Sequence, residues 1–133
     1  MPSEPGTARI SIAASELPLM DALWHTPGLA ASEVHAKAGD GRSLQTIKTL
    51  LSRLVDKGAL RTEPQGRRHL YHPLISRDAH AARSVRSLSN RLFGGRAAPI
   101  VAHLADGEGL SADDLAELEA LVAELKAREQ DND

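Results

Sequence analysis

The chain has 133 residues, of which 41% are hydrophobic, 2% are aromatic and none is cysteine. This length allows one ordinary domain, or a small domain with a helical extension. The absence of cysteine excludes disulfides and thiolate metal sites, and the scarcity of aromatic rings favours packed helices over a β-sandwich. No stretch approaches the roughly 18 apolar residues of a membrane span, and Met1 to Glu4 do not begin a secretion signal. We therefore expect a cytoplasmic protein with no membrane insertion.

The charges are unevenly distributed, although the net charge is only −2. Residues 42–72 carry seven basic and two acidic side chains, whereas residues 106–133 carry two basic and ten acidic ones. A basic middle followed by an acidic end indicates a surface that binds a polyanion, together with a solubilising tail region. Ordinary solvated faces are the alternative explanation for this asymmetry.

The N-terminal half predicts three helices after a disordered tail at residues 1–9. Ser15 can cap a helix over 16–25, a short helix follows over 31–38, and Ser43 can cap the strongest helix, over 44–57. In that last helix the apolar residues fall on one arc and the polar residues on the other. The apolar arc consists of Leu44, Ile47, Leu50, Leu51, Leu54 and Val55.

A β-hairpin is expected next, with strands at 60–63 and 68–72 joined by residues 64–67. Gly66 occupies the position that needs a positive φ. Three helices and a hairpin within about 65 residues match a winged helix-turn-helix, which we place at residues 10–75.

Three further helices are predicted, over 76–93, 97–105 and 112–129, in a C-terminal helical arm that spans residues 76–130. Since the winged helix already accounts for one core, the apolar stripe of the arm favours dimerisation through a second copy, with packing inside one chain as the alternative. The fold class is therefore mainly α. The residues predicted at the dimer interface are Leu88, Leu92, Phe93, Ile100, Val101, Leu104, Leu115, Leu118, Leu121, Val122 and Leu125.

The helix over 44–57 has the features of a recognition helix for the DNA major groove. Gln45, Thr46 and Thr49 stand at its exposed N-terminal side, where side chains meet base edges. The neighbouring polar residues suited to phosphate oxygens are Arg42, Ser43, Lys48 and Arg53, and Arg67 and Arg68 stand at the wing tip. An ordinary amphipathic core helix is the alternative.

The six histidines show no spacing typical of a metal site, and no serine has a histidine and a carboxylate at catalytic spacing. We therefore expect no metal, no cofactor and no enzymatic activity.

The sequence resembles the penicillinase repressor family of the BlaI/MecI/CopY type over residues 11–126. The resemblance is carried by the run from Ser43 to Leu54, by Lys57-Gly58, by the stretch Gly66 to Leu74, and by Arg91-Leu92-Phe93-Gly94-Gly95. It implies a homodimer with interlocking arms that binds a palindromic operator in double-stranded DNA. It assigns the base contacts to Gln45 and Thr46, the backbone contacts to Ser43, Lys48, Thr49 and Arg53, and the wing contacts to Arg67 and Arg68.

The resemblance also implies repression of a β-lactamase-type resistance operon. It further implies that a membrane-bound sensor metallopeptidase leads to cleavage of the repressor in its arm, at a site that aligns with His103-Leu104. The family usually has Pro and often Lys where this chain has Leu44 and Gln45, which bears on the operator sequence. The chain lacks the cysteine pairs of the copper-responsive members, which excludes copper sensing through that motif.

Two other functions fit the same pattern. A winged-helix adaptor would hold an acidic protein partner on the same basic face. A ligand-responsive regulator would bind a small molecule between the wing and the arm.

Overall fold

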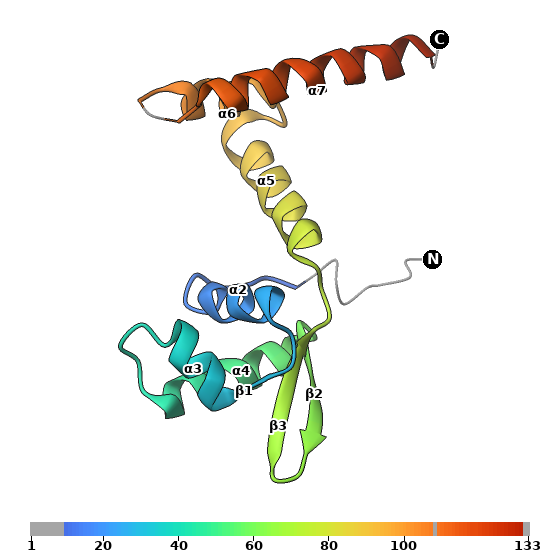
Figure 1. Cartoon of the computed structure of the whole chain (residues 1–133). Helices are drawn as coiled ribbons and strands as arrows, with labels where there is room; N and C mark the ends of the chain where they lie inside the picture. Colours follow the sequence, from blue (N-terminus) through green and yellow to red (C-terminus); the bar gives the residue numbers. More distant parts are fainter. Residues whose placement is uncertain (1–9, 108, 132–133) are drawn as a thin grey trace. The chain divides into compact units, whose positions relative to one another are not determined.

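A computed structural model describes residues 10–107 and 109–131, so the tail predicted at residues 1–9 lies outside it (Figure 1). The chain divides into two compact units, one up to Ala82 and the other from Arg83 onward. This division falls inside a helix, whereas the sequence placed the domain boundary after residue 75. The first unit contains α2 (Leu17–His25), β1 (Leu29–Ala30), α3 (Ala31–Ala38), α4 (Leu44–Lys57), β2 (Leu60–Gln65) and β3 (Arg68–Pro73). The second contains α6 (Ala98–Ala105) and α7 (Ala112–Asp131), and α5 (Arg77–Phe93) runs from one unit into the other.

The first unit is a winged helix, as predicted, and α4 has the predicted bounds. The Ser43 side chain accepts a hydrogen bond from the Thr46 amide (3.1 Å), and Gly58 ends the helix with φ of +88°. The cap predicted for the first helix is wrong. Glu16, not Ser15, holds the N-cap position of α2, and its side chain makes no cap bond to that helix. The Glu16 carboxylate instead accepts a hydrogen bond from the Ala13 amide (2.8 Å), so a turn precedes the helix.

The hairpin belongs to a three-stranded antiparallel sheet of order β1-β3-β2. Strand β2 extends beyond its predicted end to Gln65, and Pro64 pairs with His69. Proline is tolerated there because β2 is an edge strand. The turn itself is Gly66-Arg67, with φ of +63° at Gly66, the position where a type II′ turn takes glycine.

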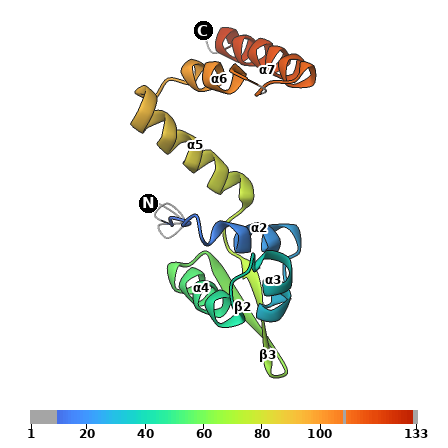
Figure 2. The ribbon, with the colours of Figure 1, turned by 90° about the vertical axis from the view of Figure 1, so that its left-hand side faces the viewer.

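The core of the molecule lies in the first unit, where α2, α3 and α4 pack beside the hairpin (Figure 2). The predicted inner face of α4 is confirmed, since Ile47, Leu51 and Leu54 are completely buried. Trp24, whose ring nitrogen donates to the Ile75 carbonyl (2.9 Å), fixes the chain that leaves β3. The other large buried apolar side chains are Ile10, Leu19, Met20, Leu23, Leu29, Val34, Leu50, Leu60 and Ile75.

The second unit has no comparable core within the described ranges. Ser89 is its one buried residue there, and neither α6 nor α7 buries a side chain. Many predicted interface residues are instead 37–64% exposed, and Phe93, Ile100 and Leu118 are half-buried. The exposed ones are Leu88, Leu92, Val101, Leu104, Leu115, Leu121, Val122 and Leu125, together with Val85. Such a unit needs a further surface to bury its apolar stripe.

The start of α7 is fixed by a reciprocal cap between Ser111 and Asp114. The Ser111 hydroxyl accepts a hydrogen bond from the Asp114 amide (3.0 Å), and the Asp114 carboxylate accepts one from the Ser111 amide (3.1 Å). Within the described ranges, no helix combines the length and apolar character needed to cross a membrane.

Candidate nucleic-acid interface

The outer face of α4 is open to solvent. Gln45, Thr46, Lys48, Thr49 and Arg53 are all exposed on it. Packing against the chain's own interior, the alternative explanation for these side chains, therefore does not apply in this structure.

Two hydroxyl groups on this face are held by short-range hydrogen bonds. The Ser43 hydroxyl donates to the Thr46 hydroxyl oxygen (3.0 Å), and the Thr49 hydroxyl donates to the Gln45 carbonyl (3.1 Å). Because the Thr49 hydroxyl is bound to the helix backbone, its methyl group is the part left for a base contact. Such a methyl group can contact the methyl group of thymine.

A groove of about 400 Å³ separates α4 from the wing. The groove brings Lys48 of α4 together with Arg67 and Arg68 of the hairpin, which lie about 20 positions later in the sequence. Tyr71 also lines it, and partial burial raises the pKa of its phenol above the ordinary value of 10.0. The phenol therefore stays neutral near pH 7 and can donate a hydrogen bond. A basic groove with a neutral donor suits a phosphate backbone.

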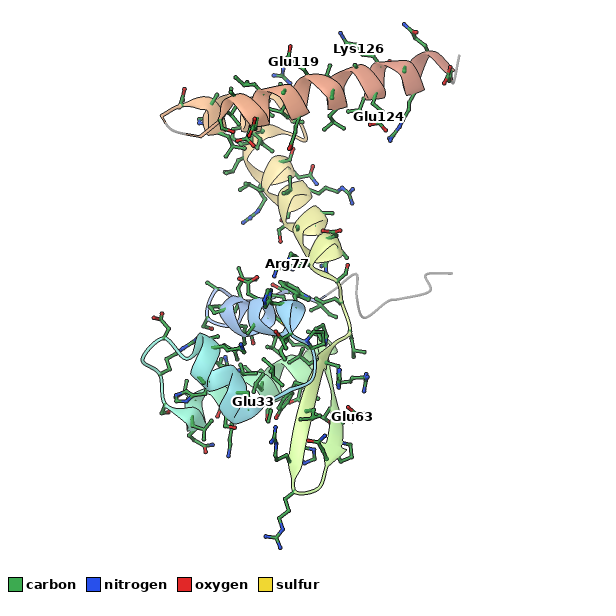
Figure 3. The ribbon with its side chains drawn as sticks, in the orientation of Figure 1. Glu33, Glu63, Arg77, Glu119, Glu124 and Lys126 are labelled. Atoms are coloured by element: carbon green, nitrogen blue, oxygen red, sulfur yellow. The ribbon has the colours of Figure 1, made fainter. Side chains whose placement is uncertain are left out.

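The two arginines of the wing differ in their surroundings. Arg68 pairs with Glu33 of α3 (2.9 Å), whose carboxylate also accepts a hydrogen bond from the Ala30 amide (2.8 Å; Figure 3). Arg67, at the turn, is exposed and has no partner in the described part of the chain. The pair between Arg68 and Glu33 links the wing to α3, and no local pattern reveals it because the two residues are 35 positions apart.

Arg42, predicted to contact phosphate, binds the protein's own backbone in this structure. Its guanidinium donates to the carbonyls of Ser15 (2.8 Å), Ala38 (3.3 Å) and Gly39 (3.1 Å). It thereby joins the end of α3 to the turn before α2 and positions the loop that leads into α4.

This geometry predicts a mainly structural effect for Arg42→Met. We expect the free energy of unfolding to fall by about 1–2 kcal/mol, because three carbonyls lose a charged donor. The salt dependence of DNA binding should stay as in the parent protein. Urea denaturation and a salt titration of binding check the two parts, and a salt slope that falls by a full unit would instead place Arg42 on a phosphate.

Within the described residues, no group of three or more histidine, aspartate or glutamate side chains could hold a metal ion.

Comparisons with known proteins identify the family of this chain. The model of the penicillinase repressor family matches residues 12–124. The chain belongs to the penicillinase repressor family. A penicillinase repressor of Bacillus licheniformis is 29% identical over 122 residues, which cover 90% of this chain and 95% of that relative. Members of this family are DNA-binding transcriptional repressors and not enzymes, so this chain is a repressor of that kind.

Two solved structures are also similar to this penicillinase repressor family member. One is the monomeric form of Bacillus licheniformis BlaI in complex with the blaP half-operator. It is 32% identical, covers 53% of this chain and 88% of that chain, and has a TM-score of 0.45. The other is a MarR family transcription regulator, 20% identical, which covers 96% of this chain and 78% of that chain with a TM-score of 0.50. The second similarity concerns the fold alone.

Proposed function

We propose that two copies of this repressor bind a palindromic operator, each placing α4 in a major groove and its wing on the adjacent backbone. The observation that carries the proposal is the open polar face of α4 beside the basic groove of Lys48, Arg67 and Arg68. An α-helix fits the major groove, and its N-terminal side chains reach base edges. Two such units joined by their arms bind more tightly than one, because the second binding event becomes intramolecular.

The contacts divide into two classes. Gln45 and Thr46 read bases, since a glutamine amide can pair with adenine N6 and N7. Phosphate oxygens are contacted by Ser43, Lys48 and Arg53 on α4 and by Arg67 and Arg68 on the wing. The Thr49 hydroxyl donates to the Gln45 carbonyl, so the Thr49 methyl group joins the base contacts. Arg42 contacts no DNA in this proposal. Its guanidinium donates to the carbonyls of Ser15, Ala38 and Gly39 and so positions the loop that leads into α4.

The homodimer forms through the arm. Its apolar side chains are exposed in the single chain, and burial of such a stripe is the main source of association energy. The half-sites should then be separated by about one helical turn, roughly 34 Å, or by a multiple of it.

The regulated genes are a β-lactamase or related resistance operon, and the repressor acts in the cytoplasm. The name of the Bacillus licheniformis relative, penicillinase repressor, supports this assignment. Release of the operator follows cleavage of the arm in response to a membrane-bound sensor metallopeptidase. The bond between His103 and Leu104 lies in α6, which buries no side chain, so local unwinding for a protease costs little there.

Two alanine variants test the division of contacts. Gln45→Ala should lose the preference for one base pair, a loss of about 1–3 kcal/mol on the preferred sequence alone. Arg53→Ala should weaken binding to all sequences and flatten the salt slope by about one unit. Binding to operator and random duplexes across a salt series measures both effects.

Arg61→Ala is the matched control, because Arg61 is an exposed arginine that lines a different groove, with Trp24 and Pro73. The assignment of roles fails if both variants lose affinity in the same way on every sequence. A parent protein that does not bind random duplex even at low salt would indicate a protein adaptor instead.

A further inference from the structure

Another groove, of about 520 Å³, lies at the end of the hairpin where Leu60 pairs with Pro73, opposite the turn. We call it the Arg61 groove. The lining residues that matter here are Trp24, Pro27, Arg61, Pro73, Leu74 and Arg77. It shares no lining residue with the basic groove beside α4, so the proposed DNA contacts leave it open. Its volume is in the range of pockets that hold small ligands.

One wall of the Arg61 groove is apolar. Pro27, Pro73 and Leu74 line it together. Leu74 is 52% exposed, more than any other large apolar side chain described in the first unit. A concave apolar surface beside a few polar groups is typical of a site for a small organic molecule.

The two arginines of this groove differ in their partners. Arg77, at the start of α5, donates to the Asp21 carboxylate (2.6 Å), and its guanidinium lies 5.1 Å from the centre of the Trp24 ring (Figure 3). Arg61 is exposed, and its guanidinium has no hydrogen-bond or ion-pair partner among the described residues. The groove therefore holds one fixed cation and one that is available to a ligand.

The other polar groups of the groove also suit an anion. No acidic residue is among its lining residues, and the Glu63 carboxylate, which pairs with His72 (2.9 Å), is outside the lining. Ser76 lines the groove, and its hydroxyl oxygen accepts a hydrogen bond from the Ala79 amide (3.0 Å). The hydrogen of that hydroxyl can thus be donated to a ligand.

We propose that the Arg61 groove binds a small organic carboxylate with an apolar body, at a site separate from the DNA-binding face. A carboxylate fits the planar fork of Arg61, which can donate two parallel hydrogen bonds to it. The apolar body covers Leu74 and the two prolines, and the burial of this surface is favourable. An inorganic anion would leave the apolar wall exposed, and a neutral apolar molecule would desolvate Arg61 without giving it a partner.

Trp24 provides a readout that is specific to this groove. It is the one tryptophan of the chain, and its ring N–H, which donates to the Ile75 carbonyl (2.9 Å), gives a single indole signal in a proton–nitrogen NMR spectrum. Titration of the full-length protein with cinnamate should shift this signal with a dissociation constant in the millimolar range or below. The neutral analogue cinnamamide and inorganic phosphate should each bind about tenfold more weakly or worse.

Two variants test the two parts of the site. Arg61→Gln should weaken cinnamate binding by about tenfold or more, because the carboxylate loses a charged donor. Leu74→Ser should weaken it by roughly fivefold through the loss of apolar contact. Arg86→Gln removes another exposed arginine, which does not line the groove, and this matched control should bind cinnamate as the parent does. Since Arg61 and Leu74 are exposed, both variants should unfold in urea at the midpoint of the parent protein.

The dissociation constant of cinnamate should be the same when the protein is saturated with a half-operator duplex, since the two grooves have no residue in common. An indole signal that does not move with cinnamate overturns the site, and so does equal binding of cinnamamide or of the Arg61→Gln variant. Loss of cinnamate binding on addition of DNA would instead place the carboxylate among Lys48, Arg67 and Arg68. The titration of the protein alone needs no DNA, so its outcome is independent of the proposed operator binding.

Discussion

Val122→Asp is expected to convert the repressor into monomers and to lower its affinity for a full operator by about 10²- to 10⁴-fold, the range that a second linked binding unit contributes. Val122 is 47% exposed on α7 and does not line the groove that Val101 and Leu104 of α6 share with Leu118 and Leu121 of α7. The substitution therefore leaves the packing of the single chain intact. In a dimer, however, it would bury an unpaired carboxylate at the interface, which is strongly unfavourable.

Ala120→Asp is the control for Val122→Asp, because it introduces the same side chain on the opposite side of α7. It should keep the mass of the dimer in light scattering and the affinity of the parent protein. Both variants should bind a single half-operator equally well, since the winged helix is unchanged. If Val122→Asp retains the mass of a dimer, the exposed apolar side chains of α7 (Leu115, Leu121, Val122 and Leu125) do not form the dimer interface.

The winged helix could be predicted in detail because its signals are local. The run from Ser43 to Gly58 contains its own N-cap, one apolar arc and a terminating glycine, so both ends of α4 and its buried side follow from the sequence. The same holds for Gly66 at the turn of the wing. These features depend on residues no more than four positions apart, the range over which periodicity and capping act.

The features that the sequence did not predict depend on distant partners. Strand β1 has only two residues, too few for an alternating pattern, and it exists because Leu29 and Ala30 pair with Tyr71 and Leu70. The charge of Arg42 and its place beside α4 are typical of a phosphate-binding residue. In the fold, however, the turn before α2 lies close enough for Arg42 to bind the Ser15 carbonyl, 27 positions away. Charge and spacing identify such a side chain without identifying its partner.

Glu16 is the clearest example of a residue whose role only the fold explains. The sequence placed it in the first helix, yet its side chain is completely buried in an ion pair with Lys57, the last residue of α4. One carboxylate oxygen accepts hydrogen bonds from the Lys57 ammonium and the Ala13 amide. The ammonium also donates to the Ser11 carbonyl (2.9 Å). This pair ties the end of the recognition helix to the segment before α2.

Lys57→Met should therefore destabilise the winged helix by about 3–5 kcal/mol, the usual effect of leaving a buried charge without its partner. The fluorescence of Trp24, the one tryptophan of the chain, follows unfolding of this unit in urea at fixed protein concentration. The double variant Glu16→Gln with Lys57→Met should regain most of the loss, because a neutral amide costs far less to bury than an unpaired carboxylate. A single variant within about 1 kcal/mol of the parent would mean that the pair is no stronger than an exposed salt bridge. Its role in fixing α4 would then fall to the apolar contacts of Ile47, Leu51 and Leu54.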